Sequence, residues 1–265
     1  MAGSFVPREH GATAMLLTPF CSAAILLRRV SWMEAAALLA VVCVFAARDP
    51  LVVLFRQRLV WKQEHEETRS AKRWLAAELI LLAACGAVLA WKGPLLPFAV
   101  LGAGAAGFTL LAVWMNVRNR QRSEWFQVAS AAGLSSTALV ACLAVEGAIP
   151  LWGWLLWFLC TLQSAAAIFV VHARLDARLA ARSGQILATR PKAAWVAVGA
   201  LAAGATAFFT CPWIGAALLI LAAGYGWELR RQRTPAGLQM RLQRVGQQLL
   251  ALSVAYSLLV IVGLW

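Results

Sequence analysis

The feature that most constrains this chain is a series of apolar runs, each close to the length needed to cross a bilayer. A helix needs roughly 20 apolar residues to span ~30 Å of hydrocarbon. Nine such runs occupy residues 11–27, 31–47, 74–91, 94–115, 125–144, 149–171, 193–209, 213–227 and 246–265. Backbone amides in lipid need internal partners, and these Ala- and Leu-rich runs are too long for barrel strands. The sequence therefore predicts an all-α fold, a polytopic transmembrane bundle of nine helices in one integral membrane domain, 1–265.

The composition excludes the other main classes of protein. Apolar residues make up 62% of the 265 residues and charged residues only 13%, about half the charged share of a soluble domain. Disordered chains are polar, and this one is not. The six cysteines form no CxxC pair and no zinc-type spacing, so we interpret them as small core residues.

The distribution of basic residues predicts the orientation of the bundle. The N-terminal segment and the loops 48–73, 116–124, 172–192 and 228–245 hold 21 of the 24 Lys and Arg residues, whereas the opposite side holds 3. Because Lys and Arg accumulate in cytoplasmic loops, we expect a cytoplasmic N-terminus and an external Trp265. This bias also explains the net charge of +13, and we expect no nucleic-acid partner.

Polar residues at the predicted cytoplasmic ends of two spans are candidates for chemistry, because charge is costly in lipid. In Arg48-Asp49-Pro50, Asp49 either pairs with Arg48 or holds Mg²⁺ in a cavity. The alternative is that the second span ends at Ala47 and Arg48 reaches the headgroups. At the end of the sixth span, His172 and Asp176 share one helix face, and Asp176 could orient the imidazole or help to bind a cation.

A second interpretation applies to the end of the sixth span. Arg174, Arg178 and Arg182 follow one another along another face of the helix. They are also expected of a helix that leaves the membrane with a solvated basic stripe, and taken alone the segment favours this second interpretation. Gln163, deeper in the same span, either contacts a ligand headgroup or bonds a neighbouring helix.

Two further segments place polar groups at the same face. The connection between the fourth and fifth spans contains Asn116, Arg118, Arg120, Arg122 and Gln127. Its three arginines suit an anionic group such as diphosphate, and the orientation rule explains them as well without a ligand. In the N-terminal segment, Arg8 and His10 either serve a cytoplasmic mouth or belong to an ordinary helix start.

The segment 7–20, which reads PREHGATAMLLTPF, resembles the opening of the YwiC-like family of bacterial membrane proteins. The resemblance continues at 48–51, 119–124, 170–178 and 234–235. It implies a multi-pass protein of the bacterial inner membrane, and it implies a fold more than a function.

A more distant resemblance is to the UbiA-type intramembrane prenyltransferases, which have nine helices and Asp-rich motifs at the cytoplasmic ends of helices two and six. The segments 48–58 and 172–182 occupy those places here. The resemblance implies a catalytic centre formed by three of these residues, an anion clamp around it, and a membrane lipid or isoprenoid as ligand. The centre would be Asp49, His172 and Asp176, and the ligand-binding residues Arg8, His10, Arg48, Arg56, Arg58, Asn116, Arg120, Arg122, Gln127, Gln163 and Arg178.

The departures from that motif limit any metal site. Asp49 stands alone where about three carboxylates belong, and His172 stands where another Asp is expected. Mg²⁺ prefers oxygen ligands, so we expect one Mg²⁺ ion at most, held by Asp49 and Asp176.

The sequence thus predicts a UbiA-like protein with degenerate Asp-rich motifs, which binds or modifies an isoprenoid or quinone-type lipid at a cytoplasm-facing polar cavity. The alternative is a non-catalytic transporter or a subunit of a membrane complex. Transporters place polar groups near the bilayer midplane, whereas the polar groups here gather at one face, which favours the lipid hypothesis.

The predicted orientation can be tested by cysteine labelling. A cysteine introduced in the loop 116–124 is expected to react only from the cytoplasmic side, and one near Gly147 only from outside. Membrane-impermeant maleimide, applied to intact and to opened cells, measures this. Labelling of both positions from the same side contradicts the nine-helix orientation.

Overall fold

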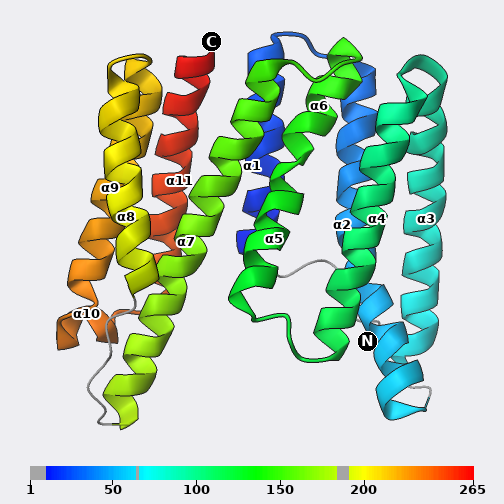
Figure 1. Ribbon diagram of the computed structural model, residues 1–265. Helices are drawn as coiled ribbons and strands as arrows, with labels where there is room; N and C mark the ends of the chain where they lie inside the picture. The colour runs from blue at the N-terminus through cyan, green and yellow to red at the C-terminus, as the bar shows by residue number, and fades with distance from the viewer. Residues whose placement is uncertain (1–9, 64–65, 184–190) are drawn as a thin grey trace. The chain divides into compact units, whose positions relative to one another are not determined.

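The computed structural model describes residues 10–63, 66–183 and 191–265, and these ranges contain helices and no strands (Figure 1). The chain forms two compact units, Met1–Trp157 and Phe158–Trp265. Each unit is described by itself below. The organisation into one membrane domain therefore stays a prediction.

The first unit is built from antiparallel helices joined by short turns. They are α1 (His10–Leu27), α2 (Trp32–Arg56), the π-helix η1 (Gln57–Trp61), α3 (Glu67–Lys92), α4 (Leu95–Val117), α5 (Glu124–Ser135), α6 (Thr137–Glu146) and the start of α7 (Leu151–Ser183). Here α2 packs against α3 and α4, and α1 packs against α5 and α6. The ends of α2 and α4 consequently lie at the same end of this unit.

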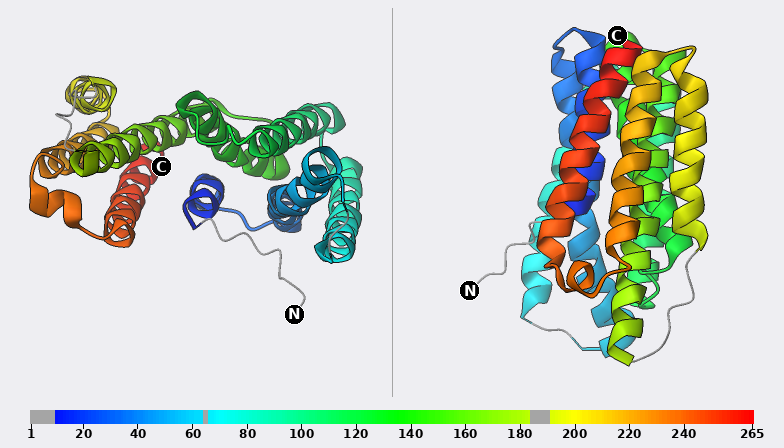
Figure 2. Two further views of the ribbon diagram at one scale, coloured as in Figure 1. Left: turned by 90° about the horizontal axis from the view of Figure 1, so that it is seen from below. Right: turned by 90° about the vertical axis from the view of Figure 1, so that its left-hand side faces the viewer.

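The second unit contains the remainder of α7 and the C-terminal helices. These are α8 (Pro191–Phe208), α9 (Pro212–Arg231), the short α10 (Pro235–Gln239) and α11 (Leu242–Leu264). In this unit α9 packs against both α8 and α11. Figure 2 shows α8 running beside α9 in two further views.

Seven helical stretches of the described residues are long and apolar enough to cross a membrane. They match the second to sixth, eighth and ninth predicted runs, with α5 and α6 together forming one stretch, Glu124–Glu146. The shorter apolar helices Gly11–Leu27 and Lys192–Phe208 match the first and seventh. The prediction of a multi-pass helical membrane protein is confirmed.

Two helices extend beyond their predicted ends. α2 continues through Arg48-Asp49-Pro50 to Arg56, so the helix itself does not end at Ala47, and the position at which the second span leaves the membrane stays a prediction. Proline removes only one helix hydrogen bond, and the buried Pro50 is retained inside α2. α7 likewise continues to Ser183.

Local sequence explains where several helices begin and end. The Ser31 side chain accepts a hydrogen bond from the Met33 N–H at 3.2 Å, which satisfies one of the free amides at the start of α2. Pro212 begins α9, where a missing N–H has no consequence. After α6 the chain turns at Gly147, whose φ of 71° suits glycine.

A close backbone approach joins α8 to α9. A Cβ atom added at Gly215 would lie 2.4 Å from the Phe208 Cα atom and 2.5 Å from its nitrogen. Backbone atoms in a helical hairpin cannot move aside as a flexible side chain can. Only glycine therefore allows this packing distance.

We expect Gly215→Ala to destabilise the protein by about 1–3 kcal/mol, the usual effect of overpacking. Thermal unfolding in detergent measures the change. Gly199→Ala in α8 is the matched control, because a Cβ there meets nothing within 4 Å and alanine favours helix. Equal stability of the two variants would show that the α8–α9 contact is looser than described.

Candidate functional site

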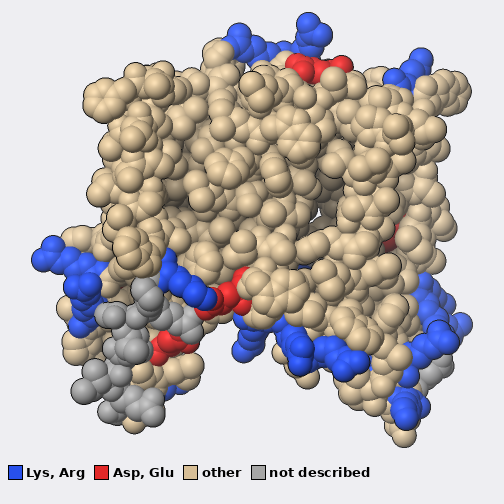
Figure 3. Space-filling model, viewed as in Figure 1, with Lys and Arg blue, Asp and Glu red and all other residues tan. Residues whose placement is uncertain are grey.

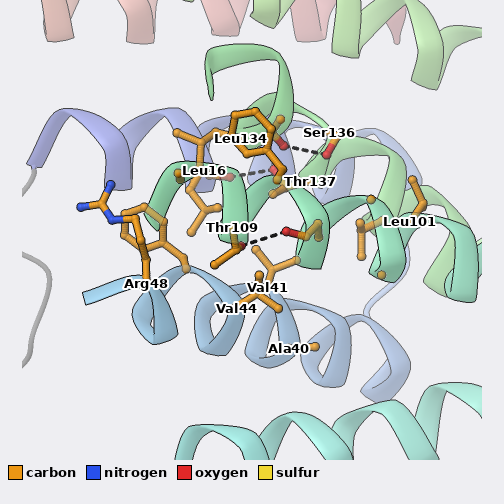
Figure 4. A pocket seen from close by; sticks show the side chains of 18 of the residues that line it. Leu16, Ala40, Val41, Val44, Arg48, Leu101, Thr109, Leu134, Ser136 and Thr137 are labelled. Atoms are coloured by element: carbon orange, nitrogen blue, oxygen red, sulfur yellow. Dashed lines mark hydrogen bonds between the residues drawn. The ribbon is translucent and has the colours of Figure 1, made fainter. Parts of the chain in front are cut away.

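The first unit contains a cavity of about 810 Å³ lined by residues of α1 to α6 and the start of α7 (Figure 4). This volume lies within the range of small-molecule binding sites. Aliphatic side chains form most of the wall, together with five aromatic ones, namely Phe45, Phe98, Phe108, Phe126 and Trp157. The cavity therefore suits a ligand with a large apolar part.

The hydroxyl groups that line the cavity are bound to the protein itself. Thr109, Ser130 and Thr137 each donate to a backbone carbonyl at 2.8 Å, and Ser136 does so at 2.7 Å. Three of these four side chains are labelled in Figure 4. The Trp157 indole N–H donates to a carbonyl at 3.0 Å. With these donors engaged, the middle of the cavity is apolar toward a ligand.

The charged and amide side chains of the cavity wall are Arg48, Asn116 and Gln121. Asn116 lies in the last turn of α4 and Gln121 follows that helix, while Arg48 lies two turns before the end of α2. Nη2 and Nε of Arg48 donate to Asp49 Oδ1 at 3.2 and 3.3 Å. The Arg48–Asp49 pairing considered from the sequence is confirmed, and the cavity has a polar end.

Arg56 fixes that polar end in place. Its Nη2 donates to the Asn116 carbonyl oxygen at 3.2 Å and to Asn116 Oδ1 at 3.0 Å. A further bond of 3.4 Å reaches Asn119 Oδ1. Asn116 in turn donates through Nδ2 to Gln121 Oε1. Arg56 thus ties the end of α2 to the turn after α4 and orients the Asn116 amide.

Three glycines leave space in the wall of the cavity. A Cβ atom added at Gly86, Gly102 or Gly104 would meet nothing within 4 Å. All three line the cavity, from α3 and α4. These small residues enlarge the cavity instead of permitting a close helix contact.

The polar residues of the second unit hold its own backbone together. Arg174 is 1% exposed and pairs with the buried carboxylate of Glu228, and its Nη2 donates to the Gly237 carbonyl at 2.6 Å. Arg178 donates through Nε to the Leu238 carbonyl at 2.8 Å and through Nη2 to the Met240 carbonyl. The arginines at 174 and 178 do not form a solvated stripe, because the α10 segment covers them with the free carbonyls of a short helix.

Two residues of this cluster were missed by the sequence analysis. Glu228 also accepts from Gln232 Nε2 at 3.2 Å, and the same nitrogen donates to the Val170 carbonyl at 3.3 Å. The available signal was a lone acidic residue in the basic segment 228–245, placed four positions before Gln232 and so on the same helix face. A buried carboxylate needs a cation as its partner, and for Glu228 that cation is Arg174.

Gln163 bonds a neighbouring helix, as one of its two interpretations predicted. Its Nε2 donates to Ser253 Oγ at 2.6 Å and so links α7 to α11. The Tyr225 hydroxyl donates to the Gln163 carbonyl at 3.1 Å. Gln163 therefore has a structural partner within the second unit.

The remaining predicted residues are dispersed. Arg120 and Arg122 are exposed on the turn after α4, and neither they nor Gln127 of α5 belong to the cavity wall described above. Arg58 lines a different cavity of the first unit. His10 is the first residue of α1, and Arg8 lies outside the described residues.

The catalytic and metal assignments remain predictions. His172 and Asp176 are half-buried on α7 in the second unit, whereas Asp49 belongs to the first. The described ranges contain no group of three or more His, Cys, Asp or Glu residues that could hold a metal ion. Since Asp49 is already paired with Arg48, the residues around the cavity do not fit a metal centre, and we derive no chemical step through Mg²⁺.

The fold and the cavity define a multi-pass α-helical membrane protein with an apolar cavity among its helices. The model of the YwiC-like protein family matches residues 6–142, more than half of the chain, so the chain belongs to the YwiC-like family. The match includes α1–α5 and most of α6, the helices that supply most of the cavity wall. No curated protein and no solved structure matches the chain. The comparisons therefore do not support the resemblance to UbiA-type enzymes.

We expect Arg174→Ala to destabilise the protein by about 3–5 kcal/mol, because it leaves the Glu228 carboxylate buried without its cation. Unfolding by SDS titration measures the effect. Arg182→Ala, an exposed arginine of the same helix, should change stability by less than about 0.5 kcal/mol.

A double variant gives an independent control for this pair. Arg174→Met with Glu228→Leu removes both charges, and it should regain much of the stability lost in Arg174→Ala. If Arg174→Ala were as stable as Arg182→Ala, the buried pair would not hold α7 against α9.

Proposed function

We propose that this YwiC-like protein binds an isoprenoid or quinone-type lipid in the cavity of the first unit, from the cytoplasmic side of a bacterial inner membrane. One observation carries the proposal: the cavity is apolar along its length and has Arg48, Asn116 and Gln121 as its charged and amide side chains. A long apolar tail and a compact polar head match this division.

The head of the ligand would be recognised by hydrogen bonding. The Arg48 guanidinium can donate to the oxygens of a quinone or of a diphosphate, and such charge-assisted bonds are strong. Asn116, held by Arg56, offers a fixed amide beside it. Since both residues lie toward the ends of α2 and α4, the head would face the same end as the basic loops.

The tail would be selected by shape rather than by hydrophobic transfer. A tail that moves from the bilayer into the protein leaves one apolar environment for another, so little driving force comes from water. Close packing against aromatic and aliphatic side chains then decides which tails fit. The open space beside Gly102 and Gly104 contributes to the shape of the cavity that a tail must fit.

The distribution of basic residues supports the placement of the polar end of the cavity on the cytoplasmic side. The segments next to it, 48–73 and 116–124, are among the most basic of the chain, whereas the other end of this unit carries Arg28, Arg29 and Lys92. Figure 3 shows basic side chains gathered near the helix ends of the visible face, with mostly uncharged residues between them. Basic loops favour the cytoplasmic side.

Filling the cavity should abolish lipid binding. We expect Gly104→Leu to weaken binding of menaquinone and of geranylgeranyl diphosphate, measured by native mass spectrometry of the purified protein. Gly107→Leu is the matched control, because Gly107 lies on the same helix in open space and is not part of the cavity wall. Arg48→Gln should weaken binding about tenfold, the effect of losing one hydrogen bond to a charged group.

Chelation provides a second arm of the same experiment. Binding should persist in EDTA, because the described residues contain no group of three or more His, Cys, Asp or Glu residues that could hold a metal ion. Equal losses in Gly104→Leu and Gly107→Leu, or no binding of either probe, would contradict the proposal. The non-catalytic transporter or membrane-complex subunit would then be the better interpretation.

A further inference from the structure

A second cavity, of about 890 Å³, lies where α2 ends and α3 begins. It shares no lining residue with the lipid cavity described above. Its wall combines three basic side chains, two buried polar ones and an apolar strip. The lipid binding proposed above does not depend on this second cavity.

The backbone at this cavity departs from ordinary helix geometry. Residues Gln57–Trp61 form the π-helix η1, and the following residue, Lys62, has a φ of 52°. Short π-helical segments occur frequently at functional sites, and a positive φ is uncommon for lysine. The side chains of Gln57, Arg58 and Lys62 all line the cavity from this segment.

Gln57 offers a buried hydrogen-bond donor to the cavity. Its side chain is 4% exposed, and its Oε1 accepts from the hydroxyl of the equally buried Thr68 at 2.5 Å. That bond leaves the amide Nε2 without a hydrogen-bond partner among the described residues. A buried donor without an acceptor is unfavourable, so an acceptor supplied by a ligand would satisfy it.

The charged side chains that line the cavity beside this donor are positive. Arg58, Lys62 and Lys72 line the cavity and are exposed. The neighbouring Glu66 and Glu67 are not among the lining residues described. A ligand with several negatively charged acceptor oxygens, such as a phosphate group, can bind the amide and these cations together.

The apolar strip points to the source of the phosphate group. Leu54, Phe55 and Leu59 line the same cavity, and Phe55 and Leu59 are 37% and 48% exposed. Trp61, also exposed, ends the membrane-length stretch Trp32–Trp61, and tryptophan is enriched where acyl chains meet headgroups. We infer that the turn between α2 and α3 binds the phosphate group of an anionic phospholipid, with Gln57 Nε2 and the three cations as its donors.

The test compares lipids on the full chain by native mass spectrometry. Phosphatidylglycerol should bind in preference to phosphatidylcholine. Lys72→Gln should reduce that binding about fivefold, the effect of one basic residue at an anionic surface. Lys92→Gln is the matched control, since it removes the same charge from the other end of α3, and it should leave binding unchanged.

A second variant separates the built site from diffuse attraction. Gln57→Glu keeps an acceptor for the Thr68 hydroxyl but replaces the amide donor with a negatively charged oxygen, so it should reduce binding at least as much as Lys72→Gln. If that variant does not fold, the exposed positions Lys62→Gln and Lys72→Gln still decide the question.

Two outcomes would overturn the inference. Equal losses in Lys72→Gln and Lys92→Gln would show that only general surface charge attracts the lipid. Inorganic phosphate, titrated onto the protein in phosphatidylcholine nanodiscs, distinguishes the source. Saturable binding of this ion that is lost in Lys72→Gln, without a preference for phosphatidylglycerol, would assign the site to a free phosphate instead of a lipid.

Discussion

The absence of water from the hydrocarbon core is the constraint on which the rest of this structure depends. Each polar group there must find its partner within the protein, and the described residues show how this is done. Hydroxyls along the cavity donate to carbonyls of their own or a neighbouring helix. Gln163 joins Ser253, and Arg174 joins Glu228. The polar groups that can bind a ligand are therefore few, and they lie at particular places in the fold.

Arginines of similar sequence context consequently have different roles in the two units. In the second unit, Arg174 and Arg178 are occupied by Glu228 and by the carbonyls of the α10 segment, so they stabilise the return of the chain. In the first unit, Arg56 orients Asn116, while Arg48 lines the cavity. The surroundings of an arginine in the fold, and not its position near a helix end, therefore decide its role.

The two lipid sites proposed for the first unit would recognise different parts of a lipid, one the tail within the membrane and the other the headgroup at its surface. The cavity with the apolar wall at α4 would select a lipid tail by its shape. Shape is the main source of selectivity where the bilayer and the protein interior are both apolar. The cavity beside η1 offers charge, which is effective at the membrane surface where anionic headgroups lie. The match to the YwiC-like family, residues 6–142, includes every residue that lines the cavity beside η1 and all but Trp157 of those that line the other cavity.

The sequence by itself determined the helical class and the multi-pass apolar pattern, and it named candidate polar residues, because apolar length and charge are read along the chain. As one alternative in each case, it also predicted the Arg48–Asp49 pair and a bond from Gln163 to a neighbouring helix. Only the tertiary structure decided that Arg56 holds Asn116, 60 positions away, and that Arg174 pairs with Glu228, 54 positions away. Those contacts depend on how each helix is rotated about its axis and on which helix lies next to it, and neither is encoded in a local pattern.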